Sequence, residues 1–340
     1  MFKILKEKYF MEYYTNGFIE TNISLSNNLV NEIQEYYARK KIGHNDFPKF
    51  FDYNEHLAYM MQKKFFNFFL KVFPKFAKIS VKNFYNKSYS KAVYCEQIFI
   101  KKVLKELSEK GFFRFFKAHY MLVSYDMYLH SNHLSSAAGI HSDLPNFHHF
   151  YETENDLSIY IPLVDLNYIN GGKLKVLPEK KLKIPGNMLL KLLYEYFSKN
   201  IIYLDKNNYI DPNLINYSKI NSFIKSTMHQ ELMSIYKNML SLVKTQYIND
   251  FTETIETKGK VLLFNNKNFH FAEYWKNTQQ AREIYVIRML PIYDVKIKLK
   301  NKLHGKSFNN FLLNFSENKI QFYKESVDIS KISRNNKIPL

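Results

Sequence analysis

Two groups of short strand-like runs, separated by a long helical segment, constrain the fold of this chain more than any other feature. The first group, "AHYMLVSYDMYLH", "DLSIYIPLVDL" and "GKLKVLP", lies within residues 118–178. The second group, "GKVLLF", "NFHFAEYW" and "AREIYVIRML", lies within residues 259–290. Runs of this length that are rich in β-branched and aromatic residues and bounded by turn residues are typical of antiparallel strands. The sequence therefore predicts a mainly β fold with α additions.

The pattern divides the chain into three regions. Residues 1–118 are expected to form a mainly helical N-terminal region packed on the core. In it, Gly111 ends a predicted helix whose apolar residues recur at helical spacing: Ile100, Val103, Leu104 and Leu107. Residues 119–290 form the predicted β core. Residues 291–340 are expected to contain a strand, "KIKLK" at 296–300, a short helix near 308–325 and a basic tail.

A helical insertion is predicted at 179–258, between the two groups of strands. Thr227-x-x-Gln230 has the form of a capping box at the start of a helix. The apolar face that follows consists of Leu232, Ile235, Tyr236, Met239, Leu242 and Val243. An insertion between barrel strands is suited to form a lid or a recognition wall over a site.

Composition narrows the class of protein. Hydrophobic residues make up 46% of the 340 residues, which is enough for a sizeable core. No uncharged apolar run reaches the roughly 18 residues of a membrane helix, and the N-terminus lacks the apolar run of a signal peptide. The single cysteine, Cys95, excludes an internal disulfide framework and fits a reducing compartment. We therefore expect a soluble cytoplasmic protein with no membrane span.

The formal charge of +18 does not by itself indicate nucleic-acid binding. Lysine is abundant throughout, and the densest basic stretch, at 296–306, lacks the arginine clusters of common nucleic-acid modules. A basic surface slightly favours a small-molecule substrate that is anionic or linked to a carrier.

Three His-x-acid triplets occur: His44-x-Asp46, His141-x-Asp143 and His229-x-Glu231. On a strand, His141 and Asp143 would project from the same face, because strand side chains alternate with period two. His44-x-Asp46 lies in the helical region with no strand pair after it. Residues i and i+2 of a helix do not face each other, which disfavours His229-x-Glu231 as a ligand pair.

His270 is the candidate for a third ligand, because it follows a short apolar strand and a polar turn. Two imidazoles and one carboxylate form the facial triad of non-haem Fe(II) oxygenases, which leaves coordination positions open. If the cosubstrate is a dicarboxylate such as 2-oxoglutarate, its far carboxylate needs a cation. Arg282 on the next strand is the first candidate, because guanidinium can donate two parallel hydrogen bonds. Arg288 should share its face and is the reserve candidate.

The order of these motifs resembles the phytanoyl-CoA dioxygenase family of Fe(II)/2-oxoglutarate-dependent oxygenases. Members carry a His-x-Asp, an "NG-x-L-x-V-x-P" segment, a strand-turn-His and a trailing Arg. The corresponding segments here are His141-Ser142-Asp143, "NGGKLKVLP", "GKVLLFNNKNFH" and Arg282. The resemblance covers residues 119–290, about half the chain. Two features depart from the family: Pro178-Glu179-Lys180 stands where members often have Gly-Ser-His, and the insertion at 179–258 is long.

The resemblance implies a double-stranded β-helix (jelly roll, cupin-like) with the metal at one open end of the barrel. It implies that His141, Asp143 and His270 bind Fe(II), and that Arg282 holds the distal carboxylate of 2-oxoglutarate. With O2, such an enzyme oxidises an unactivated C–H bond of a small biosynthetic molecule and releases succinate and CO2. The carboxylate of Asp143 favours hydroxylation, desaturation or cyclisation, because related halogenases have a small residue there.

Neighbouring polar and aromatic residues are weaker candidates. Ser158 or Tyr160 could reach the cosubstrate, although a structural role is the simpler expectation for both. Phe147, His148 and His149 lie beyond Asp143 and are candidate substrate contacts. Two other readings stay open: a zinc hydrolase that uses His141, Asp143 and one of these histidines, and a non-catalytic barrel that binds ligands through its basic surface.

Overall fold

The fold is taken from a computed structural model. It describes residues 5–39, 72, 91–93, 95–117, 120–131, 140–142, 157–181, 222, 225–254, 257–265, 268–277, 279–291, 302–303, 306–307, 311–314 and 319–322. Every strand pair formed by these residues is antiparallel.

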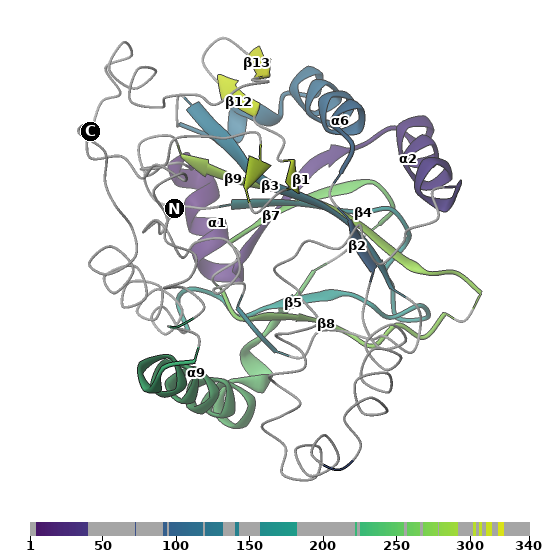
Figure 1. The fold of residues 1–340 in the computed structure, drawn as a ribbon. Helices are drawn as coiled ribbons and strands as arrows, with labels where there is room; N and C mark the ends of the chain where they lie inside the picture. Colours follow the sequence, from purple (N-terminus) through teal and green to yellow (C-terminus); the bar gives the residue numbers. More distant parts are fainter. Residues whose placement is uncertain are drawn as a thin grey trace.

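The larger sheet crosses the centre of the molecule (Figure 1). Its strands are β1 (Phe18–Ser24), β2 (Lys91–Val93), β3 (Tyr120–Ser131), β4 (Leu157–Pro162), β7 (Lys260–Phe264), β9 (Arg282–Pro291), β12 (Phe311–Asn314) and β13 (Lys319–Phe322). Their order is β1-β7-β4-β9-β3-β12-β13, and β2 pairs with β3. The predicted strands β3, β4, β7 and β9 therefore lie side by side, although the insertion separates them in the sequence.

A smaller sheet lies over one face of the larger one. It contains β5 (Leu174–Val176), β6 (Thr252–Glu253) and β8 (His270–Ala272) in the order β6-β5-β8. A separate short pair is formed by β10 (Lys302–Leu303) and β11 (Lys306–Ser307). From β4 to β9 the chain crosses repeatedly between the two sheets: β4 belongs to the larger sheet, β5 and β6 to the smaller, β7 to the larger, β8 to the smaller and β9 to the larger.

The helices are α1 (Glu7–Asn16), α2 (Asn27–Arg39), α6 (Gln97–Glu109) and α9 (Thr227–Gln246), with 3-10 turns at Phe112–Phe115 and Ile248–Asp250. In Figure 1, α2 and α6 lie on the side of the larger sheet opposite β5 and β8, and α9 lies beside the smaller sheet. The helix predicted before Gly111 is confirmed as α6. Gly111 follows it with φ 75°, a conformation that favours glycine.

Two apolar cores follow from the alternation of side chains along the strands. Along β9, Tyr285, Ile287 and Met289 pack with residues of α2 and α6. Ile284 and Val286 instead face the smaller sheet. The core between the two sheets consists of Phe18, Tyr160, Val164, Leu166, Leu174, Val176, Leu262, Phe264, Trp275, Ile284 and Val286. Each central strand is thus buried on both faces, as a sheet covered on both sides requires.

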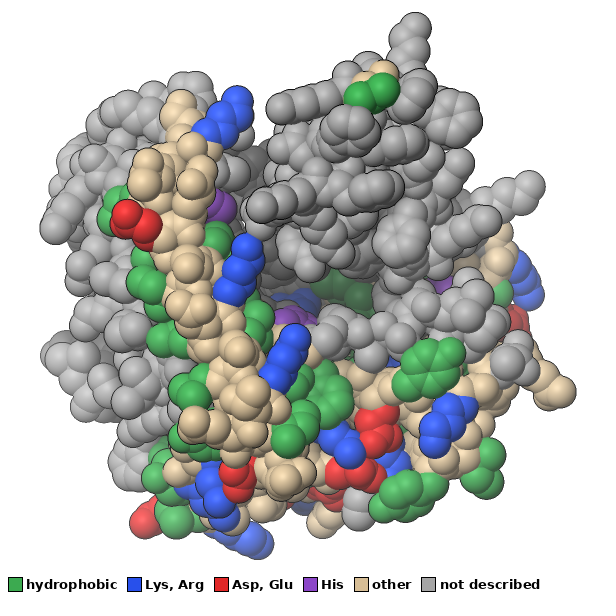
Figure 2. All heavy atoms as spheres, turned by 90° about the horizontal axis from the view of Figure 1, so that it is seen from below, with side chains coloured by type: hydrophobic (Ala, Val, Ile, Leu, Met, Phe, Trp, Pro, Cys, Tyr) green, Lys and Arg blue, Asp and Glu red, His purple; other side chains and the backbone are tan. Residues whose placement is uncertain are grey.

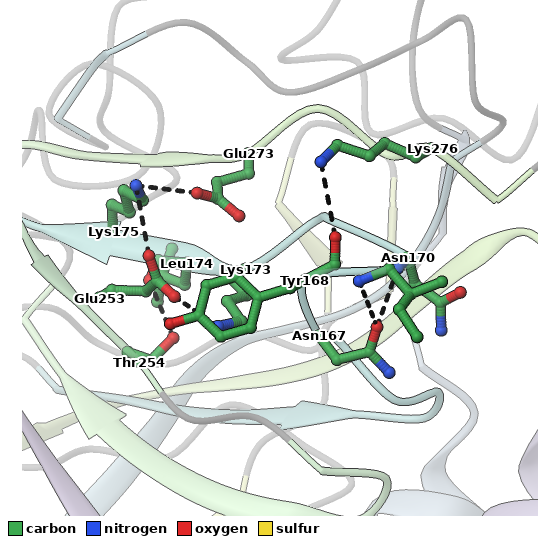
Figure 3. Close-up of polar contacts among 11 residues, drawn as sticks. Asn167, Tyr168, Asn170, Lys173, Leu174, Lys175, Glu253, Thr254, Glu273 and Lys276 are labelled. Carbon is green, nitrogen blue, oxygen red and sulfur yellow. Dashed lines mark hydrogen bonds and ion pairs between the residues drawn. The ribbon is translucent and has the colours of Figure 1, made fainter.

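Charged side chains connect the strands of the smaller sheet on its other face (Figure 3). Lys175 of β5 contacts Glu273 at 2.8 Å and Glu253 of β6 at 3.3 Å. The ammonium group of Lys173 is also paired with Glu253 and lies 3.4 Å from the centre of the Tyr168 ring. These pairs hold β5 in register between β6 and the segment of β8.

Two sequence predictions need correction. The segment expected to form a helix near 308–325 contains the hairpin β12–β13, in which Phe311 pairs with Phe322. The helix of the insertion is capped by Ser226, whose side chain accepts a hydrogen bond from the backbone N–H of His229, so the cap is not Thr227. The N-terminal region, predicted to be mainly helical, contributes α1, α2 and α6, and also β1 and β2, which extend the larger sheet. The strand predicted at 296–300 lies outside the described residues.

No helix in the described part of the chain has both the length and the apolar character needed to span a membrane.

Glu283 of β9 is a buried carboxylate on the side of the sheet that faces the helices. It accepts hydrogen bonds from Gln34 of α2 and Tyr128 of β3, and Nδ1 of His130 lies 3.8 Å away. The Tyr128 ring stacks on Tyr37 at 4.1 Å, which fixes its hydroxyl. Burial alone would raise the pKa of the Glu283 carboxyl, but the contacts with His130, Tyr128 and Gln34 outweigh it and lower that pKa.

We predict that Glu283→Gln reduces the free energy of unfolding at pH 7 by about 1–3 kcal/mol. Since its pKa is lowered on folding, the Glu283 carboxylate stabilises the fold above its ordinary pKa of 4.5, and this contribution is lost as pH falls through the lowered value. The free energy of unfolding, measured with urea at pH values from 7 to 3, should therefore decrease less steeply with falling pH in the variant than in wild type. The same decrease of the free energy of unfolding with pH in variant and wild type would contradict this assignment.

Candidate functional site

His141 and His270, two candidate ligands far apart in the sequence, lie opposite each other in the structure. The backbone N–H of His141 donates to the His270 carbonyl at 3.0 Å, and the N–H of His270 donates to the His141 carbonyl at 2.8 Å. Residues paired in this way point their side chains to the same face of the sheet. Their ring centres are 4.4 Å apart, which is close enough for both imidazoles to contact one ion.

The environment of His270 selects its tautomer. Its Nδ1 lies 2.8 Å from the backbone carbonyl oxygen of Asn268. A carbonyl oxygen only accepts hydrogen bonds, so Nδ1 carries a proton, and in the neutral imidazole Nε2 then presents its lone pair. Histidines that bind metals usually have this arrangement, with the second ring nitrogen donating to a carbonyl or carboxylate. His270 is only 6% exposed, so this orientation is held by packing.

A continuous series of side-chain contacts connects the histidines to Arg282. The His270 ring meets the edge of Phe264 with centres 5.2 Å apart, and Phe264 meets Tyr160 at 6.0 Å. The Tyr160 hydroxyl accepts a hydrogen bond of 2.6 Å from Nη2 of Arg282. Phe264 and Tyr160 belong to the core between the two sheets, so Arg282 reaches the same interior as the imidazoles.

Arg282 is buried and fixed at two points. Besides its bond to Tyr160, its Nε donates to the carbonyl oxygen of Gly172 at 2.9 Å. A Cβ atom on Gly172 would lie 2.8 Å from the Trp275 ring and 3.0 Å from Cδ of Arg282. The glycine of the "NGGKLKVLP" segment thus makes room for the guanidinium. These two bonds use two of the five N–H groups of Arg282 and fix the plane of its guanidinium group.

Arg288 and Ser158 lie further along the same face. Arg288 lies an even number of residues from Ile284 and Val286 on β9, and Ser158 lies two residues from Tyr160 on β4. Since those three residues belong to the core between the sheets, Arg288 and Ser158 face the same side. They are direct partners across β4 and β9, and both are buried. Arg288 is therefore on the face of Arg282, as the spacing predicts, but six residues further along β9.

The other sequence candidates lie outside the described residues: Asp143, Phe147, His148, His149 and the triplet His44-x-Asp46. Within the described residues, no three His, Cys, Asp or Glu side chains form a group that could hold a metal ion. His229 and Glu231 lie on helix α9, and burial lowers the pKa of the His229 imidazole. The structure thus brings together His141 and His270, with Arg282 and Tyr160 nearby.

Sequence reasoning missed the role of Tyr236 in this region. It lies on the buried face of α9 together with Leu232 and Val243, whereas the predicted face residues Ile235 and Leu242 are exposed. Its hydroxyl contacts the backbone of Ser142, a contact 94 residues apart in sequence. A helical apolar pattern shows only that Tyr236 is buried, and not which backbone its hydroxyl meets.

Viewed from the side of the smaller sheet and α9, the molecular surface is hollowed near its centre (Figure 2). Histidine, basic and apolar side chains are visible inside the hollow.

No family profile and no curated protein matches the sequence. Solved structures to which the chain is similar include the epimerase SnoN in complex with Fe3+, alpha ketoglutarate and nogalamycin RO, at 10% identity and TM-score 0.45, covering 84% of this chain and 83% of that chain. HygX from Streptomyces hygroscopicus with nickel, 2-oxoglutarate and hygromycin B bound matches at 11% identity and TM-score 0.43, covering 89% and 96%. EctD from S. alaskensis with 2-oxoglutarate and 5-hydroxyectoine matches at 10% identity and TM-score 0.44, covering 87% and 78%.

We predict that Gly172→Ala destabilises the protein more than Gly111→Ala does. The two glycines have nearly the same φ, 74° and 75°, so alanine costs about 1–2 kcal/mol of backbone strain at each. At Gly111 the added Cβ meets nothing closer than 3.9 Å, whereas at Gly172 it collides with Trp275 and Arg282. The excess, about 1–3 kcal/mol, would appear in urea unfolding. Equal losses would show that the contact with Arg282 is not tight.

Proposed function

We propose that this protein is a non-haem Fe(II)- and 2-oxoglutarate-dependent oxygenase that acts on a small molecule. We base the proposal on the residues of this chain, and its main support is the pairing of His141 with His270. The change of sheet from β4 through β9 supports a double-stranded β-helix for residues 119–290, with 179–258 as the insertion.

The residues present fit a divalent iron site. Two imidazoles lie side by side, and the lone pair of His270 Nε2 is set by the Asn268 carbonyl. The third ligand in this proposal is Asp143, two residues after His141. Two histidines and one carboxylate suit iron and leave positions for a cosubstrate and O2. Bound iron, with 2-oxoglutarate and O2, would supply the oxidation of a C–H bond with release of succinate and CO2.

Arg282 is the proposed partner of the distal carboxylate of 2-oxoglutarate. Its guanidinium is buried, and the bonds to Gly172 and Tyr160 hold its orientation. A fixed fork can form two parallel hydrogen bonds with a carboxylate at a small entropic cost. Tyr160 would act as a support for Arg282. Arg288, with Ser158 beside it, is the alternative position for the same carboxylate.

The proposed substrate is a small biosynthetic molecule that is anionic or linked to a carrier. The +18 charge of the chain supports an anionic group. Phe147, His148 and His149 are the proposed substrate contacts. The proposed reaction is hydroxylation, or desaturation or cyclisation, because the carboxylate of Asp143 would occupy the position that halogenases leave to halide.

We predict that Fe(II) and 2-oxoglutarate, added together without oxygen, produce a weak visible charge-transfer band, and that neither does so alone. His270→Ala, His141→Ala and Asp143→Ala should each abolish the band, since each removes a ligand. Coupled succinate formation should be lost in the same variants.

His229→Ala is the matched control, because this histidine also belongs to a His-x-acid triplet but lies on helix α9. It should keep both the band and the metal affinity. A wild-type protein that binds zinc tightly and does not respond to 2-oxoglutarate would contradict the proposal and favour a hydrolase.

We also predict that Arg282→Lys weakens 2-oxoglutarate binding about 10- to 100-fold while Fe(II) affinity stays unchanged, because a lysine cannot form the bidentate pair. Titration of the Fe(II) protein with 2-oxoglutarate would measure this. Arg288→Lys is the comparison, since this arginine is buried on the same face of β9. If only the Arg288 variant lost affinity, the assignment of the two arginines would be reversed.

A further inference from the structure

The insertion helix α9 makes a direct contact with the segment that carries His141. The backbone N–H of Ser142 donates to the Tyr236 hydroxyl at 2.9 Å, and this hydroxyl lies 3.3 Å from the Ser142 carbonyl oxygen, to which it donates. One hydroxyl thus holds both backbone polar groups of the residue that follows His141. Ser142 is 2% exposed, so water does not replace these bonds easily.

The ring of Tyr236 makes a second contact, with Phe269, the residue just before the strand that carries His270. It lies nearly parallel to the Phe269 ring, with an interplanar angle of 17° and centres 6.4 Å apart. Phe269 directly precedes His270, and its backbone carbonyl accepts a hydrogen bond from Leu177. Tyr236 therefore touches the neighbour of each histidine, one through its hydroxyl and one through its ring.

We propose that Tyr236 is a positioning residue for the metal site, through which the insertion sets the distance between the two imidazoles. This inference rests on the function proposed above. Tyr236 itself is not a proposed metal ligand. It restrains the backbone on both sides of the His141–His270 pair, as hydrogen-bonded neighbours restrain the ligands of other metal sites.

Helix α9 is built to hold Tyr236 in place. Leu232 lies one turn earlier on the same buried face, and Val243 extends that face toward the end of the helix. Ser226 caps the first turn. The same helix also carries exposed apolar residues such as Ile235 and Leu242. A ligand that bound there and shifted α9 would also shift Tyr236, and through it the backbone beside both imidazoles.

The test compares Tyr236→Phe with Leu232→Ala in the full chain, using Co(II) as the probe. Phenylalanine keeps the ring on Phe269 and removes only the hydroxyl. We expect about 10-fold weaker Co(II) binding and an altered Co(II) visible spectrum in Tyr236→Phe. Leu232→Ala should lower the thermal midpoint more, by loss of packing, yet keep the wild-type spectrum and bind Co(II) within about 2-fold of wild type.

Three outcomes would overturn the inference. If Tyr236→Phe binds Co(II) as wild type does and with the same spectrum, Tyr236 does not position the site and the proposed function stands. If both variants weaken Co(II) binding alike, in proportion to their loss of thermal stability, the role of Tyr236 is only structural. If wild type itself binds no Co(II), the proposed function fails and the inference fails with it.

Discussion

The two backbone hydrogen bonds between His141 and His270 are the interaction on which the candidate site depends. They bring together a short segment before the insertion and the first residue of β8. Because strand side chains alternate, a shift of one residue in this pairing would turn one imidazole away from the other. The register of β8 is supported by its pairing with β5, in which Val176 lies opposite His270, and by the ion pair between Lys175 and Glu273.

Strand β9 contributes to the site and to stability through its alternation. Arg282 points toward the space between the sheets, where Gly172 and Tyr160 hold it. The next residue, Glu283, points to the opposite side and connects α2 with β3. Two adjacent charged residues are therefore buried without facing each other, and each has hydrogen-bonding partners of its own, as buried charges require.

The sequence predicted the local features of this fold well because they depend on neighbouring residues. The strand runs and helix α6 follow from the periodicity of apolar residues along the sequence. The hairpin at Phe311–Phe322 was predicted wrongly as a helix, because short apolar runs fit either period. Strand β1 was missed, since it pairs with β7 through contacts that span most of the chain.

Contacts between distant segments were beyond prediction for the same reason. Nothing near Tyr236 indicates that its hydroxyl meets Ser142, which lies 94 residues away in the sequence. This contact depends on how the insertion packs against the segment that carries His141, which is a property of tertiary packing. The spacing of Arg282 and Arg288 did predict their common face, because parity along one strand is a local property.

The most direct test of the proposed metal site is an anaerobic crystal structure with Fe(II) and 2-oxoglutarate, with the metal located by its anomalous scattering. We expect one metal ion bound to Nε2 of His270 and to a ring nitrogen of His141, each at about 2.0–2.2 Å, with Asp143 as the third ligand and the far carboxylate of 2-oxoglutarate on Arg282. A metal ion bound elsewhere, with both imidazoles left without a metal, would contradict it.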